Sequence, residues 1–270
     1  LSRRDPTIQG LRWKLGRATL DPAYGASADG RCQVKPRAFD YVRPDTIAEA
    51  VDQLAQFGED ARILAGGQSL MAIMNLRMAE PKVLIDISGH KDLKGIKVSG
   101  GFLEVGASVT QNELLSWPDL AKVCPLLAKS MPWVGHFQTR NRGTVCGSLS
   151  HADPSSEIPL SLATLGGEVV LRSKRGDRVL AADEFQTGML STAREADEMM
   201  IAARFPTADN LKHVAFREVA RRHGDFAILA LAAVAETSAT VRLGIGGLAD
   251  RPIATRIDTS SEGSIADADR

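Results

Sequence analysis

The sequence contains only three cysteines, Cys32, Cys124 and Cys146, and no two of them form a CxxC pair. This scarcity argues against a disulfide framework, a zinc site or an iron–sulfur site held within this chain. The chain also lacks a net charge, because 33 basic side chains balance 33 acidic ones. A neutral chain gives no electrostatic reason to expect nucleic acid or an anionic membrane as a general partner.

Long apolar runs are absent too, since none approaches the roughly 18 residues that span a bilayer. The first ten residues, LSRRDPTIQG, carry charge but no apolar signal core. We therefore expect a protein without a membrane span that is located in the cytoplasm. What is present is ordinary for a globular protein: 270 residues with 44% hydrophobic and 24% charged side chains, enough for one large domain or two to three small ones.

Local patterns predict helices and strands from residue 35 onward. Asp45 or Thr46 can cap an amphipathic helix that begins at Ile47. Helices interrupted by Pro118 and Pro125 are expected between residues 112 and 131. Strands are expected in the apolar or alternating stretches at 61–65, 81–88, 102–109 and 199–205, in a strand–turn–strand unit at 168–180, and in the β-rich remainder. The last twenty residues are expected to form a loose tail.

A glycine pair, Gly66-Gly67, separates the strand at 61–65 from the apolar helical run that follows. Glycines at such a junction permit positive φ and close backbone approach, and the N–H groups at a helix start favour an anion such as phosphate. The stretch matches neither GxGxxG nor a P-loop. Taken alone, the pair is more typical of a tight turn without a ligand.

A second element, TRNRGTVCGSLSHADPSSEIP at residues 139–159, is again rich in small residues. Gly143, Thr144, Gly147 and Ser148 would free backbone N–H groups, so two such loops could cradle the two phosphates of a dinucleotide. The alternatives are a helix opening at Asp153-Pro154 and, for Cys146, burial as a small apolar residue.

Three blocks of sequence resemble the FAD-binding medium subunit of molybdenum hydroxylases, the family of the xanthine dehydrogenase and carbon monoxide dehydrogenase medium subunits. They are AGGQSL at 65–70 with LRM and DIS downstream, RNRGTVCGSLSHADPSSEIPL at 140–160, and FREVARRHGDFAILALAA at 216–233. The blocks occur in the family's order and the likeness runs from about residue 35 to 252. Two features depart from the family: Cys146-Gly147 replaces the usual Gly-Gly, and the C-terminal region is shorter.

The resemblance implies an α+β protein. Residues 1–34 would be a loosely ordered extension without a family counterpart. Residues 35–209 would be an FAD-binding domain of two α/β subdomains, the larger one with an antiparallel sheet. Residues 210–270 would be a truncated C-terminal domain of sheet plus helix.

The resemblance also implies which residues bind FAD. The first loop would wrap the pyrophosphate, the second would form the opposite wall, a carboxylate would contact the ribose or adenine, and the third block would border the isoalloxazine ring. The full set is Leu64, Ala65, Gly66, Gly67, Gln68, Ser69, Leu70, Thr139, Gly143, Thr144, Val145, Cys146, Gly147, Ser148, His151, Asp153, Glu157, Ala227 and Ile228. No catalytic residue and no metal ligand is expected, and Cys146 is expected to be buried, unpaired and inert.

Within such a complex the chain would carry electrons rather than oxidise the organic substrate. A large subunit would hold the molybdopterin-type molybdenum cofactor, and a small subunit would hold two [2Fe–2S] clusters that reduce FAD. FAD would then pass the electrons to an external acceptor. The expected assembly is a dimer of heterotrimers, without nucleic acid.

Two other functions are compatible with the residues. A self-contained flavoprotein oxidase or dehydrogenase would need its own acid or base beside the flavin, and His136, His223 and Asp225 are the candidates. A structural subunit that has lost its cofactor is the other alternative, with Cys146 and the altered ends as its support.

Overall fold

The computed structural model describes residues 15–17, 36–208 and 213–259. Cys32 and most of the 1–34 extension lie outside these ranges, so the loose order expected for that extension stays a prediction, as do the domain boundaries. Across the described ranges, no helix is long and apolar enough to cross a membrane. Helices and strands are mixed, with one partly parallel sheet and two larger antiparallel sheets, which confirms the α+β fold class.

The first layer is a small sheet with the strand order β1-β2-β4-β3. Strands β2 and β3 run parallel to β4, and β1 pairs with β2 antiparallel. Helix α1 covers this sheet with Ala50, Val51 and Leu54, and the Thr46 hydroxyl caps its start by accepting the Glu49 N–H. The elements are β1 Leu15–Arg17, β2 Asp40–Val42, α1 Ile47–Phe57, β3 Ala61–Leu64, α2 Leu70–Asn75 and β4 Val83–Asp86.

The second layer is a five-stranded antiparallel sheet with the order β5-β6-β11-β7-β8. One face of its central strands is apolar and buried, whereas the other face carries the part-exposed ion pairs of Arg204 with Glu104 and Glu168. The strands are β5 Ile96–Ser99, β6 Phe102–Gly106, β7 Glu168–Ser173, β8 Gly176–Ala181 and β11 Met199–Pro206. The helices and the small hairpin are α3 Gln111–Leu115, α4 Leu120–Val123, α5 Pro125–Ser130, α6 Phe137–Arg140, α7 Val145–His151, α8 Glu157–Leu165, α9 Ala182–Phe185, β9 Gln186–Gly188 and β10 Ser191–Thr192.

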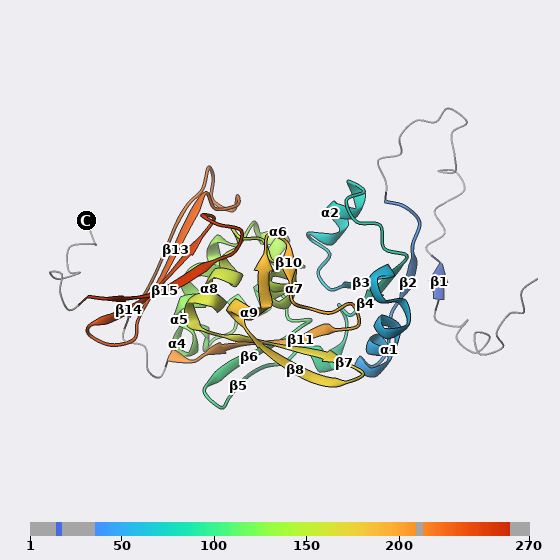
Figure 1. The fold of residues 1–270 in the computed structure, drawn as a ribbon, viewed down its shortest axis with the longest axis horizontal. Helices are drawn as coiled ribbons and strands as arrows, with labels where there is room; N and C mark the ends of the chain where they lie inside the picture. Colours follow the sequence, from blue (N-terminus) through green and yellow to red (C-terminus); the bar gives the residue numbers. More distant parts are fainter. Residues whose placement is uncertain (1–14, 18–35, 209–212, 260–270) are drawn as a thin grey trace, which may run out of the picture.

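The third layer is the antiparallel meander β12-β13-β14-β15, formed by β12 His213–Val219, β13 Leu229–Ala235, β14 Thr240–Gly246 and β15 Ile253–Asp258. One face of this sheet packs on α8 and α5, which lie between it and the second layer (Figure 1). Helix α8 is buried along almost its whole length for this reason. After residue 213, the part of the chain that the structure describes contains strands but no helix.

Two expectations about local structure are wrong. The second small-residue element is largely helical, because Thr144 caps α7 and the residues from 145 to 151 form its two turns. The last twenty residues are not all a loose tail, since residues 253–258 form β15. That strand pairs antiparallel with β14, with Ile253 opposite Ile245 and Asp258 opposite Thr240.

Candidate functional site

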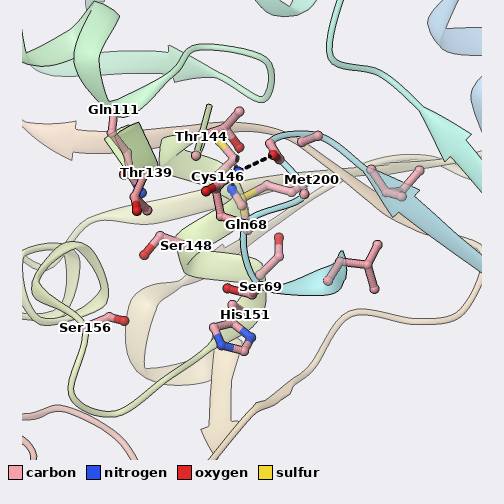
Figure 2. A pocket seen from close by; sticks show the side chains of 18 of the residues that line it. Gln68, Ser69, Gln111, Thr139, Thr144, Cys146, Ser148, His151, Ser156 and Met200 are labelled. Carbon is pink, nitrogen blue, oxygen red and sulfur yellow. Dashed lines mark hydrogen bonds between the residues drawn. The ribbon is translucent and has the colours of Figure 1, made fainter. Parts of the chain in front are cut away.

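A cavity of about 600 Å³ lies between the first layer and the helices of the second. Its wall is built from the turn before α2, the starts of α6, α7 and α8, the turn and strands at 190–200, and the loop tip at 224–226. Figure 2 shows Gln68 and Ser69 from the first glycine element and Ser148 and His151 from α7, all of which line it. The volume is typical of a small-molecule or cofactor site.

The two glycines of the first element serve different needs. Gly67 has a φ of +69°, in the left-handed region that other residues rarely adopt. At Gly66 the constraint is space, because an added Cβ would lie 2.2 Å from the Arg142 carbonyl oxygen and 2.7 Å from the Gly143 Cα. The backbone of the first element therefore touches the backbone of the second, and the two elements form adjoining walls of one cavity.

The second element is held in place from α3 and by its own cap. The Thr144 hydroxyl accepts the Gly147 N–H at 2.9 Å and so fixes the first turn of α7. Thr110 and Thr144 form an isolated β-bridge, and the Gln111 N–H donates to the Gly143 carbonyl at 2.8 Å. A Cβ on Gly147 would lie 2.7 Å from the Thr144 hydroxyl, so a glycine is favoured there by the cap.

Cys146 lies in the first turn of α7, where φ is negative, and its side chain is 2% exposed. The thiol donates a weak hydrogen bond to the Val105 carbonyl at 3.5 Å, and both cysteines in the described residues are free. Burial raises the pKa of the Cys146 thiol to about 12. The expectation that Cys146 is buried and unpaired is therefore confirmed, while its lack of reactivity stays a prediction. The helix explains why a side chain replaces the family's glycine without strain.

Charged groups at the α7–α8 end of the cavity have shifted pKa values. Burial raises the pKa of Glu157 to about 8, and the Glu218 and Asp153 carboxylates add to that rise. Burial lowers the pKa of His151, against the opposing effect of Asp153. Asp153 itself accepts the Ser155 N–H at 2.8 Å and so shapes the turn before α8. The helix opens at Glu157, after Ser156, and not at Asp153-Pro154 as the helix-opening alternative predicted.

Most of the predicted binding residues line the cavity together. They are Ala65, Gly66, Gly67, Gln68, Ser69, Leu70, Thr139, Gly143, Thr144, Cys146, Gly147, Ser148, His151 and Glu157. The structure does not place Leu64, Val145, Asp153, Ala227 or Ile228 among the lining residues. Val145 is fully buried and Ile228 is 60% exposed. The preceding residues of that third block, Gly224, Asp225 and Phe226, reach the cavity instead.

Sequence analysis did not predict several of the residues that line the cavity. Gln111 is the first residue of α3 and lies between the two capping-box residues Thr110 and Glu113. That box could have marked the helix start that carries it. Two of them, Leu190 and Arg194, come from a turn that is distant in sequence. Leu190 has a φ of +54°, and Arg194 donates to the Glu198 carbonyl at 2.8 Å. Their local sequence carries no signal of the cavity. Ser156, Met199 and Met200 are further examples.

The wall suits a ligand that combines phosphates with polar and apolar parts. Gln111 Oε1 is buried in the wall without a hydrogen-bond partner among the described residues, so it can accept from a ligand. Arg62 and Arg194 add positive charge at one side. Helix α2 has only six residues, so anion binding at the first element would rest on local N–H groups rather than on a long helix dipole. Within the described ranges, no three His, Cys, Asp or Glu side chains gather as a metal site.

These features are typical of proteins that bind a small molecule or cofactor in a cavity, and here two small-residue elements line it. Comparison with known proteins identifies the class more closely. Residues 37–208 match the family described as the FAD binding domain in molybdopterin dehydrogenase. The chain belongs to this family, which confirms the family that the sequence resembles; the first two sequence blocks lie within the matched residues.

Curated relatives extend the match. The beta subunit of caffeine dehydrogenase from Pseudomonas sp. strain CBB1 is 40% identical over 195 residues, covering 72% of this chain and 66% of the relative. The carbon monoxide dehydrogenase medium chain of Hydrogenophaga pseudoflava is 36% identical over 203 residues, covering 75% of this chain and 71% of that one. The chain thus spans about two thirds of the length of the relatives it matches.

A solved structure also shares this fold. Quinoline 2-oxidoreductase from Pseudomonas putida 86 superposes with a TM-score of 0.78 at 37% identity, covering 82% of this chain and 78% of that one. The chain is therefore an FAD-binding domain of the medium-subunit type found in molybdenum hydroxylases.

Proposed function

We propose that this chain is the FAD-carrying electron-transfer subunit of a multi-subunit molybdenum hydroxylase. A small subunit would supply electrons from its [2Fe–2S] clusters, and an external acceptor would receive them. The observation that carries the proposal is that both predicted elements line the same cavity. They touch there, where the Gly66 backbone lies against Arg142 and Gly143. Bound FAD would supply the redox chemistry, since it accepts and releases electrons.

The residues of this chain would bind and orient that cofactor. The backbone at Gly66, Gly67 and Ser69 and the start of α7 would lie against the pyrophosphate. Gln111 Oε1 would accept hydrogen bonds from the sugar and ribityl groups, and the hydroxyls of Ser148 and Ser156 would accept or donate them. Met199 and Met200 would add apolar contact. The loop tip at 224–226 would close one end of the cavity.

The relatives support an electron-transfer role over a substrate-binding one. Proteins of 36% to 40% identity to this chain are named for substrates as different as caffeine and carbon monoxide. A domain that contacted the substrate would differ more between them. We accordingly place the organic substrate on the molybdenum subunit, and propose a dimer of heterotrimers in the cytoplasm as the assembly.

Native affinity purification through this chain tests the proposal. We expect size-exclusion chromatography to show a complex of three kinds of polypeptide with about one FAD, one molybdenum and four irons per trimer. The flavin absorbance should bleach on adding organic substrate only when the partners are present. A lone chain that oxidises an organic substrate would support the self-contained flavoprotein, in which His136 and Asp225 of the cavity wall would supply the acid or base. A chain without flavin absorbance would support the structural subunit.

A further inference from the structure

Arg140, the last residue of α6, holds the turn that precedes this helix. Its Nη1 donates to the carbonyl oxygens of Val134 and Gly135, each at 2.9 Å, and makes a longer contact of 3.5 Å with that of Pro132. Hydrogen bonds from a charged donor are shorter and stronger than those between neutral groups. Gly135 has a φ of +47°, a left-handed conformation in which two successive carbonyls can reach one nitrogen. One arginine side chain therefore fixes the backbone of residues 132–135.

The guanidinium keeps this position although one of its donors has no acceptor. Arg140 Nε is buried without a hydrogen-bond partner in the described part of the chain. A donor left unpaired in this way costs stability, and its presence calls for a reason beyond the local fold. The turn that Arg140 holds supplies such a reason, because Val134, Gly135 and His136 of this turn line the cavity.

The loop tip at 224–226 packs directly against the same turn. Gly224 has a φ of +88°, and a Cβ added to it would lie 2.8 Å from the Gly135 carbonyl oxygen and 2.7 Å from His136 Nδ1. The Gly135 carbonyl oxygen is therefore shared by two contacts, since Arg140 donates to it and Gly224 lies against it. A change in the direction of this carbonyl would displace the loop tip.

A second contact joins the loop to the turn. The ring centroids of Trp133 and His223 are 5.1 Å apart, a separation at which aromatic rings attract each other. Within the loop, the Asp225 N–H donates to the Arg222 carbonyl at 3.1 Å. The loop is thus folded on itself and supported from one side by the turn that Arg140 fixes.

We propose that Arg140 is a positioning residue, which sets the loop tip over one end of the cofactor cavity through the Gly135 carbonyl. The inference rests on the proposed function, since Asp225 and Phe226 of the loop tip line the same cavity. The third sequence block is expected to border the isoalloxazine ring, so this ring is the part of FAD that the loop tip would cover. Without the guanidinium the two carbonyls would lose their donor, and the loop tip would lose its support.

Iodide quenching of flavin fluorescence in the FAD-loaded full chain tests this role, because quenching by collision measures how far the isoalloxazine ring is exposed to solvent. Arg140→Met keeps the apolar stem and removes the donors. We expect iodide quenching in this variant to rise toward that of free FAD. We expect FAD to dissociate about tenfold faster, since hydrogen bonds from charged groups contribute on that scale. Arg140→Lys keeps a charged donor and should restore most of both values.

Gly224→Ala tests the same contact from the side of the loop, because its Cβ would push the loop tip off the turn while Arg140 stays in place. It should raise iodide quenching as Arg140→Met does. The double variant should add little more, since both changes break one contact. Arg251→Met is the matched control, because Arg251 Nη1 also donates to two carbonyls, those of Asp183 and Gln186 at 3.2 and 3.1 Å, and does not line the cavity. The control loses the same charge and should leave quenching unchanged.

Each outcome decides one point. Iodide quenching that is equal in Arg140→Met and the wild-type chain would overturn the inference, and so would an equal rise in Arg251→Met. Fully additive effects in the double variant would overturn it too, because Arg140 and Gly224 would then act separately. If Arg140→Met does not fold, Arg140→Gln takes its place in the same comparison. A wild-type chain that takes up no FAD would instead count against the proposed function.

Discussion

The two walls of the cavity use small residues for different physical reasons. In the first wall the backbone itself demands glycine, because Gly67 has positive φ and Gly66 touches the neighbouring chain. In the second wall the small residues lie in a capped helix with ordinary φ, so a cysteine can replace a glycine and turn its side chain into the core. The first wall should therefore tolerate almost no side chain, and the second should tolerate one that points away from the ligand.

We expect Gly66→Ala to cause the largest loss of stability and of FAD affinity. The new Cβ would lie 2.2 Å from the Arg142 carbonyl oxygen, so the two walls must separate. We expect a loss of about 3 kcal/mol in unfolding free energy, at the upper end of overpacking costs, and FAD affinity at least about tenfold weaker. Thermal unfolding and flavin titration measure the two quantities. Gly95→Ala is the matched control, since nothing lies within 4 Å of its added Cβ. Equal unfolding free energies and equal FAD affinities in the two variants would contradict contact between the walls.

A smaller effect is expected for Gly67→Val. The residue must adopt positive φ, which costs about 1–2 kcal/mol, and its side chain would press on Leu64 and Met71 at 3.1 and 3.3 Å. Gly58→Val separates strain from binding, because Gly58 also has positive φ but lies in open space outside the cavity. Both variants should lose stability, and only Gly67→Val should lose FAD. Full FAD occupancy in Gly67→Val would show that the first element is not part of the site.

Thr144→Ala probes the second wall through its cap. Losing the hydroxyl that accepts the Gly147 N–H should cost about 1 kcal/mol and weaken FAD binding severalfold, since the first turn of α7 would fray. Thr144→Ser, which keeps the hydroxyl, should retain both the stability and the FAD affinity. Thr46→Ala removes the equivalent cap from α1, so it should cost similar stability without a change in FAD affinity. If both alanine variants bind FAD normally, the start of α7 does not contact the cofactor.

The smallest effect on FAD is expected for Cys146→Gly. The thiol faces the core, so occupancy should be retained while stability falls by about 1 kcal/mol, because glycine is unfavourable in a helix. In a Cys32→Ser background, thiol reagents should modify the native holo-protein slowly, since burial raises the pKa of the thiol. Rapid modification of Cys146 with loss of flavin would show a thiol that faces the cofactor.

The sequence predicted most elements because their signals are local. The Thr46 cap, the apolar strands and the two prolines in 112–131 each act over a few residues, and the structure has helices or strands where they indicated. The helix α7 was missed because glycine and serine favour turns when taken alone. The Thr144 cap and packing on β11, α8 and β6 stabilise it.

The sequence predicted the residues of the cavity wall at positions that require glycine. It did not predict residues that reach the cavity only through tertiary contacts. Gly66 and Gly67 carry their constraint in the sequence itself. Arg194 and Leu190 reach the cavity only because the fold brings distant turns together, so no local pattern could reveal them. Ala227 and Ile228 were implied by the family resemblance, and the structure places Phe226 of the same block at the cavity instead.

Hydrogen exchange of the chain with and without FAD tests most directly whether the two walls form one site. The account predicts that FAD slows exchange at the amides of residues 65–70 and of residues 143–148 together, and that Gly66→Ala abolishes protection in both stretches. Unchanged exchange is predicted for β15, which lies outside the cavity. Protection of only one stretch, or protection confined to the third-layer sheet, would contradict a single FAD site between the two elements.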